Sequence, residues 1–360
     1  MKFKFLAYAL VSILVFSCGN AENDVFFNPN QGQGLGEGQV VDPCLNLGEN
    51  ELVLSIQDQF TTLPGKVSIF FKVSNNDGGP VPNLTADQFT IYEQGRNDDC
   101  FNTISSSESL ARISPNSQIF SNNTLLVLDL SNSVLSSSLE ELKTASVSFI
   151  ENVMPNTNQE SFRMAIYWFD GENELHLLNA LTNSQEELIT AVNGITPDIS
   201  NDPSTDLFGA VIKSTEIAEQ LLIDSTSDAI KAASIVIFTD GTDQASRFTD
   251  TAALNSVNNA NPNISFFTIG LGSEIDTDIL TDIGKTFSVF ANNKSELETT
   301  FSDISTRVSE QANSFYLFEY CSPKRDGSGE NNLAIQVKNG NLQGSVQTKF
   351  SANGFLGGCE

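Results

Sequence analysis

Hydrophobic and polar positions follow one pattern in the central part of the chain and another on either side of it. Between residues 121 and 312, short apolar runs alternate with segments whose apolar residues recur every three or four positions. The runs have the length and aliphatic character of buried strands, and the intervening segments have the period of amphipathic helices. The predicted strands are residues 124–130, 162–169, 174–181, 234–239, 264–270 and 287–290.

Helices are predicted between these strands, over residues 135–153, 184–194, 207–222 and 295–308. Strands that alternate with helices predict an α/β fold, in which a doubly wound, mostly parallel six-stranded sheet is covered by helices on both faces. The third strand follows the second after the short connection 170–173. We therefore expect the third strand to run antiparallel at one edge of the sheet.

The regions before and after this domain show the two-residue alternation of half-buried β-strands. The predicted strands there are residues 51–56, 65–73, 88–92, 315–320, 333–337 and 346–351. Because three strands are marginal as a separate domain, we expect the C-terminal strands to join the N-terminal ones in a single β-sandwich. The α/β domain would then be inserted in this sandwich or flanked by it. The predicted parts are residues 44–120, 121–312 and 313–360.

The N-terminus has the pattern of a targeting segment. Lys2 and Lys4 precede an apolar run over residues 5–16, which is too short to span a bilayer and is typical of a signal-peptide core. Cys18 follows this run after a small residue, as in the cleavage site of bacterial lipoproteins, which the segment resembles. We predict a lipoprotein signal peptide over residues 1–17 and lipid attachment at Cys18. An ordinary secretory signal with an incidental cysteine is the alternative.

The region after Cys18 is polar and rich in Gly, Asn and Gln, so residues 18–43 are predicted to form a flexible tether. This arrangement predicts a protein of the bacterial cell envelope, attached to the outer membrane only through its N-terminal lipid. Whether it faces the periplasm or the outside stays open.

Composition narrows the classes of partner. The formal net charge of −27 argues against nucleic acid, because a phosphate backbone needs a basic surface. The same charge disfavours direct contact with an anionic membrane surface and fits an attraction for divalent cations.

An even number of cysteines besides Cys18 predicts two disulfides in an exported protein, with all three pairings open. These candidates are Cys44, Cys100, Cys321 and Cys359.

Oxygen donors gather where the predicted strands end. Asp129, Ser131 and Ser133 follow the first strand, Asp240 follows the fourth, and Thr205 lies in the loop before the third helix. In an open α/β sheet, ligands bind at the carboxyl ends of the strands, and hard oxygens suit Mg²⁺, Ca²⁺ or Mn²⁺. Helix N-caps would also explain Asp and Ser here, but three caps would have to coincide at one edge.

The pattern Asp129-x-Ser131-x-Ser133, together with Thr205 and Asp240 before a glycine, resembles the three motifs of the von Willebrand factor A (VWA) domain. The resemblance covers roughly residues 121–312 and implies a Rossmann-like fold with a metal-ion-dependent adhesion site. It implies that these five side chains hold Mg²⁺, or Ca²⁺ or Mn²⁺, directly or through water. Such a set leaves one position on the metal for an outside group, so we expect a protein partner that supplies an Asp or Glu carboxylate, the best match in charge and hardness.

Residues near this motif set add three expectations. Asp206 and Asp243 could contact water around the metal. Residues 202–204 stand where many family members have two glycines, which affects the expected shape of the loop before Thr205. Residues 81–95 resemble the β domain that precedes the A domain in many bacterial secreted proteins.

We expect a binding protein and not an enzyme. The chain has one histidine, His176, expected at the surface of the edge strand, and it contains no nucleophile elbow and no phosphate-binding loop. A Mg²⁺-dependent phosphohydrolase is less favoured, because Ser131 stands where a second acid would be useful and no basic residue flanks the motif. A structural role in assembling an envelope complex stays open beside adhesion.

Overall fold

A computed structural model describes residues 40–105, 110–113, 120–155, 161–223, 230–325 and 329–359. The predictions for the signal peptide, for Cys18 and for all but the end of the tether lie outside these residues. Within the described ranges, no helix combines the length and the apolar character needed to cross a membrane.

The central domain contains a six-stranded sheet in the order β11-β10-β9-β6-β7-β8. All neighbouring strands are parallel except β8, which is antiparallel to β7 at the edge. The predicted fold class and the antiparallel edge strand are therefore confirmed. The strands are β6 (Phe120–Asp129), β7 (Phe162–Phe169), β8 (His176–Thr182), β9 (Ile230–Thr239), β10 (Ile264–Leu271) and β11 (Phe287–Ala291).

Helices cover both faces of this sheet, because its central strands are apolar on both sides. In β6, Leu126 and Leu128 pack in one core with α2, α3 and α7, whereas Leu125 and Val127 pack in the other core with α4, α5 and α6. This two-sided burial explains the continuous apolar run in the strand. The helices are α1 (Asn132–Ser137), α2 (Leu139–Val153), α3 (Gln185–Asn193), α4 (Leu207–Ile223), α5 (Asp250–Asn259), α6 (Thr277–Ile283) and α7 (Leu297–Ala312).

The helices differ from the sequence prediction in two places. The helix predicted over 135–153 is interrupted at Ser138, whose φ is −133°, in a run of serines that favours competing local hydrogen bonds. The sequence prediction also missed α5 and α6, each of which buries only two apolar side chains. At the start of α3, the sequence Ser184-Gln-Glu-Glu187 is typical of a capping box, and the structure has its first hydrogen bond, from the Glu187 amide to the Ser184 hydroxyl at 3.3 Å. The Ser184 amide donates to the Thr182 hydroxyl at 3.2 Å and not to Glu187.

Strands from both ends of the chain form two antiparallel sheets, in the orders β1-β2-β12-β5 and β14-β13-β3-β4. The C-terminal strand β12 pairs with β2, and β13 pairs with β3, so each sheet combines both flanking regions around one shared core. The strands are β1 (Leu52–Thr62), β2 (Lys66–Asn75), β3 (Phe89–Gln94), β4 (Asn102–Ile104), β5 (Arg112–Ile113), β12 (Phe315–Cys321), β13 (Glu330–Asn339) and β14 (Leu342–Ser351).

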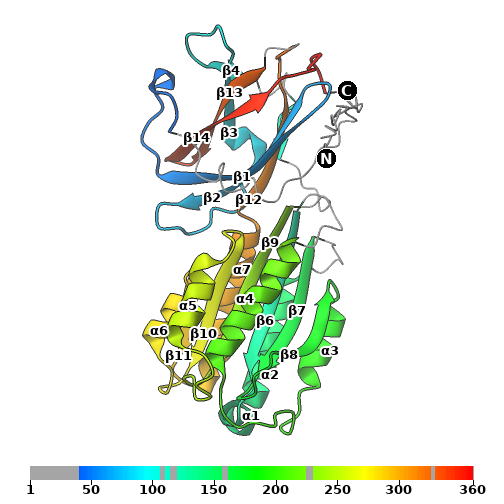
Figure 1. Ribbon diagram of the computed structural model, residues 1–360, viewed down its shortest axis with the longest axis vertical. Coiled ribbons are helices and arrows are strands. Elements are labelled where there is room, and N and C mark those ends of the chain that lie inside the picture. The colour runs from blue at the N-terminus through cyan, green and yellow to red at the C-terminus, as the bar shows by residue number, and fades with distance from the viewer. Residues whose placement is uncertain are drawn as a thin grey trace, which may run out of the picture.

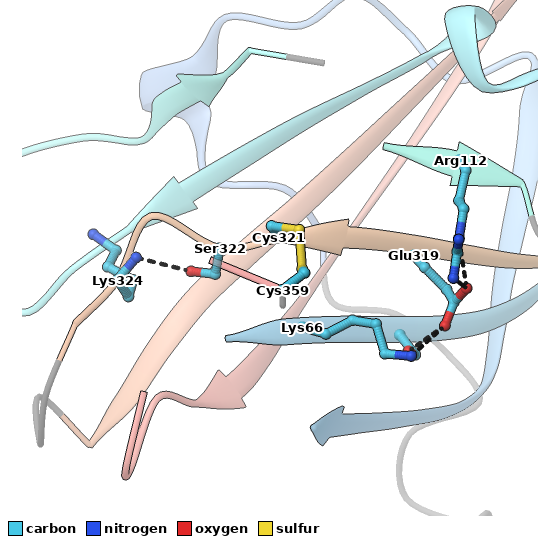
Figure 2. Close-up of a disulfide and its surroundings, with 8 residues drawn as sticks. Lys66, Arg112, Glu319, Cys321, Ser322, Lys324 and Cys359 are labelled. Atoms are coloured by element: carbon cyan, nitrogen blue, oxygen red, sulfur yellow. Dashed lines mark hydrogen bonds and ion pairs between the residues drawn. A yellow bond between two sulfur atoms is a disulfide. The ribbon is translucent and has the colours of Figure 1, made fainter. Parts of the chain in front are cut away.

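Two disulfides close this sandwich, and of the three open pairings the structure has Cys44 with Cys100 and Cys321 with Cys359. Figure 2 shows the second bond at the end of β12. Nearby, the buried Glu319 carboxylate forms ion pairs with Lys66 at 3.0 Å and Arg112 at 2.8 Å. These ion pairs link β12 to its neighbours β2 and β5 on either side.

The sandwich lies at the end of the α/β domain where β6 begins and α7 ends (Figure 1). The carboxyl ends of the parallel strands, marked by α1 directly after β6, lie at the opposite end. The edge that carries the predicted metal ligands therefore faces away from the sandwich.

Candidate metal centre

Three loops meet at the carboxyl edge of the sheet, and backbone hydrogen bonds join them. The amide of Asn132, after β6, donates to the carbonyl of Pro203 at 3.2 Å. The amides of Gln244 and Ala245, after β9, donate to the carbonyl of Thr205 at 2.9 and 3.0 Å. The loop that carries Thr205 is thus tied to both loops that carry the other predicted ligands.

Hydrogen bonds link four of the five predicted ligands, Asp129, Ser131, Ser133 and Asp240, to one another. The hydroxyls of Ser131 and Ser133 are 3.2 Å apart, and the Ser133 hydroxyl donates to Asp240 Oδ1 at 2.7 Å. Behind them, Asp129 Oδ1 accepts from the backbone amide of Ser131 at 2.9 Å. Thr205 is buried on the adjoining loop. Side chains from two strand ends thus converge, with the third loop bound beside them.

Sequence reasoning gave no role to Thr239, the last residue of β9. Its hydroxyl donates to Asp129 Oδ2 at 2.6 Å and so fixes the orientation of that carboxylate. The signal was available, since Thr239 immediately precedes Asp240 in the third motif. Recognising it required the parallel pairing of β6 with β9, which brings the two strand ends together.

The electrostatics of this cluster favour a bound cation. Burial raises the pKa of Asp129 to about 6, an increase that hydrogen bonds from Thr239 and Ser131 oppose and the charge of Asp240 adds to. Burial also raises the pKa of Asp240. The hydrogen bond from Ser133 lowers this pKa, and the negative charge of Glu274 raises it further. A divalent cation between these carboxylates would offset the cost of keeping both ionised. The donor set of carboxylates and hydroxyls fits a hard ion such as Mg²⁺, Ca²⁺ or Mn²⁺.

The sequence model of the von Willebrand factor type A domain matches residues 123–306, which is half of the chain. The chain belongs to the VWA domain family. The cluster of carboxylates and hydroxyls described above lies within the matched residues. A comparison with curated proteins finds no match for this chain.

Solved structures similar to this VWA protein share little sequence with it. BatB from Bacteroides thetaiotaomicron is 17% identical with a TM-score of 0.41, over 53% of this chain and 99% of BatB. Proximal thread matrix protein 1 from the mussel byssus, with a zinc-occupied metal-ion-dependent adhesion site, is 15% identical with a TM-score of 0.44. The match covers 53% of this chain and 48% of that protein. The manganese-loaded TRAP protein of Plasmodium vivax is 11% identical with a TM-score of 0.42. The match covers 70% of this chain and 100% of the TRAP structure.

Asp206 and Asp243 both bind the start of α4 in this VWA domain. Asp206 is buried and accepts from the Gly209 amide and from Lys213 Nζ, each at 3.1 Å. Asp243 accepts from the Phe208 amide at 3.1 Å, and burial raises its pKa. The two carboxylates therefore hold the helix that directly follows Thr205. Their contact with metal-bound water stays a prediction.

We expect the affinity of the VWA site for Mg²⁺ to fall as the pH drops below about 6, the pKa of Asp129 in the metal-free protein. The metal needs the ionised carboxylate, so proton and cation compete, and affinity should fall by up to about tenfold per pH unit below that value. Above pH 7 it should be nearly constant. Titration calorimetry at pH 7.5, 6 and 5 measures this dependence, and an unchanged affinity across the series would contradict the raised pKa.

Proposed function

We propose that this VWA domain binds a protein ligand through a divalent cation held by five side chains. The proposed ligands are Asp129, Ser131, Ser133, Thr205 and Asp240. The observation that best supports this proposal is that solvent exposure increases across this group. Asp129 and Ser131 are buried, Asp240 is partly exposed, and Ser133 is exposed. A cation there would have protein oxygens behind it and solvent in front.

The chemistry of the set favours a carboxylate as the incoming group. Mg²⁺ prefers about six oxygen ligands near 2.1 Å, so five protein side chains leave a place for one oxygen from outside. The two protein carboxylates balance the charge of the ion and do not make the site negative. An Asp or Glu carboxylate of the partner is a hard oxygen ligand and adds a charge-assisted bond. This bond gains strength when the interface excludes water, so the loops around the site would set specificity.

The surroundings favour binding over phosphoryl transfer. Among the described residues, no lysine or arginine forms an ion pair or a hydrogen bond with the carboxylate of Asp129 or Asp240. Phosphoryl transfer uses cationic groups to stabilise the transferred phosphate. We therefore propose that the protein is not an enzyme, and a generic phosphate ester tested with Mg²⁺ should not be hydrolysed.

We further propose that the protein is held at the bacterial cell envelope by lipid on Cys18. The described chain begins at Val40 and enters the sandwich first, and the metal edge lies at the far end of the VWA domain (Figure 1). A tether of this kind would present the site away from the membrane. Adhesion to an external ligand and assembly of an envelope complex would use the same surface.

Affinity capture tests the proposed function. The immobilised chain is incubated with envelope extract of the source bacterium in Mg²⁺ or in excess EDTA, and bound proteins are identified by mass spectrometry. We expect partners that require Mg²⁺ and are lost with Asp240→Ala but kept with Asp282→Asn, an exposed carboxylate on α6. Recovery of the same partners in EDTA, or from Asp240→Ala, would contradict a metal-dependent interface.

A further inference from the structure

The turn between β7 and β8 brings together three side chains that the proposed function does not use. Asp170, Glu172 and His176 each offer one ligand atom, and these atoms lie within 4.8 Å of one another. The antiparallel pairing of β7 and β8 produces this arrangement, because Trp168 and His176 are register partners across the hairpin. The cluster is therefore a product of the hairpin and not of sequence spacing alone.

The imidazole of His176 is held in place and has an unused nitrogen. Its ring stacks on Trp168 with centroids 4.1 Å apart and an interplanar angle of 15°. Only 20% of the side chain is exposed, so the expected surface-facing histidine is mostly covered. Its Nε2 is buried and finds no hydrogen-bond partner among the described residues, although Glu172 Oε2 lies 3.4 Å away. A buried nitrogen without a partner costs free energy that a metal bond would recover.

Asp170 is also fixed in position with an acceptor site to spare. Its Oδ2 accepts from the Ser200 hydroxyl at 2.7 Å and from the amides of Asn201 and Asp202 at 3.3 Å. Among the residues that the structure describes, its Oδ1 accepts only the Glu172 amide, at 2.8 Å, which leaves one lone pair on that oxygen. Within the described part of the chain, no lysine or arginine forms an ion pair with Asp170 or Glu172.

The third side chain, Glu172, can complete the group with a small movement. Ligand atoms of a tetrahedral zinc site are about 3.4 Å apart, given bonds of about 2.1 Å. Because the ligand atoms all lie within 4.8 Å of one another, the widest separation must shorten by at most about 1.4 Å. The side chain of Glu172 is 37% exposed, so it has the freedom to make this adjustment while Asp170 and His176 stay in place.

We propose that Asp170, Glu172 and His176 form a second metal site, specific for Zn²⁺ or a similar borderline cation. One imidazole nitrogen and two carboxylates suit zinc, whereas the oxygen-only set around Asp129 suits a harder ion. Three protein ligands leave a fourth position for water or an outside group. The site adjoins the loop that leads to Thr205, since Asp170 binds that loop at residues 200–202. It does not depend on the proposed function.

His176 is the only histidine in the 360 residues, which makes the test specific. The chain is purified without a polyhistidine tag, saturated with Mg²⁺ and given one equivalent of Zn²⁺. X-ray absorption at the zinc edge should show imidazole scattering, which His176 alone can supply. Asp129→Ala, which removes the other centre, should keep both this signature and the zinc affinity. Failure of that centre to bind a partner therefore leaves this test unaffected.

Variants with matched controls complete the test. His176→Phe keeps a ring to stack on Trp168 but removes the nitrogen, and it should abolish the imidazole signature and lower zinc affinity by roughly 100-fold or more. Glu172→Gln should also weaken zinc binding with the histidine intact, whereas Glu174→Gln, an exposed neighbour in the same turn, should not. Zinc should raise the melting temperature of wild type, Asp129→Ala and Glu174→Gln, and should raise that of His176→Phe and Glu172→Gln less or not at all.

Three results would overturn the proposal. These are a zinc spectrum without imidazole, an unchanged zinc affinity in His176→Phe, and zinc binding that disappears with Asp129→Ala. The last result would place the zinc at the oxygen-only centre. If His176→Phe fails to fold, Glu172→Gln against Glu174→Gln decides the question, and equal affinities for that pair would overturn it.

Discussion

Asp129→Asn is expected to abolish Mg²⁺ binding and, in the same protein, to stabilise the metal-free fold at neutral pH. Asp129 is fully buried, and burial raises its pKa to about 6, so at pH 7.5 the metal-free protein holds an ionised carboxylate in the interior. Asparagine keeps an oxygen for the Ser131 amide but carries no charge. The substitution therefore removes both the charge that attracts the cation and the cost of burying it.

The sign of the stability effect follows from proton linkage. The pKa of Asp129 is raised from 3.8 to about 6 on folding, so the folded state binds the proton more tightly. Between about pH 4 and pH 6 the stability of the metal-free wild type then falls as the pH rises. The full shift corresponds to about 3 kcal/mol, at about 1.4 kcal/mol per unit. The advantage of Asp129→Asn should accordingly be largest above pH 6 and should vanish near pH 4.

Denaturant unfolding in EDTA at pH 7.5 and pH 4, together with Mg²⁺ calorimetry, measures both effects. Asp282→Asn makes the same change of charge on the exposed surface of α6 and should alter neither Mg²⁺ affinity nor stability. If Asp129→Asn binds Mg²⁺ as tightly as wild type, Asp129 is not a ligand. If Asp129→Asn is less stable than wild type in EDTA at pH 7.5, the buried carboxylate does not destabilise the metal-free fold.

Phe301→Ala is expected to destabilise the VWA domain by about 3–5 kcal/mol. Phe301, on α7, has no exposed surface and lies between two aromatic partners, with ring centroids 6.2 Å from Phe149 and 5.8 Å from Phe238. It thereby joins α7 to α2 and to the sheet. Truncation removes the apolar burial and leaves a cavity that helices packed on a sheet close only partly.

The single tryptophan allows this effect to be measured in the VWA domain alone. Trp168 is buried in β7 and is the only tryptophan of the chain, so its fluorescence follows this domain and not the sandwich. Phe290→Ala is the control, because Phe290 is 38% exposed at the edge strand β11. It should cost less than about 1 kcal/mol. Equal losses in the two variants would contradict the central packing role of Phe301.

The elements that the sequence predicted correctly depend on local patterns. The apolar run before Asp129 is buried on both faces and therefore shows the composition of a central parallel strand. The short connection after β7 allows only an antiparallel edge strand, which the structure contains. The α5 and α6 helices were missed because each buries only two apolar residues, too few to establish a period.

The amino-acid sequence by itself determined the alternation of strands and helices, the β-rich ends and the oxygen donors at the strand ends. Each of these follows from the residue types in one short segment. Only the tertiary structure decided the pairing of Cys44 with Cys100, the support of Asp129 by Thr239 and the meeting of Asp170 with His176. These contacts depend on strand order and register, which arise when distant segments pack together.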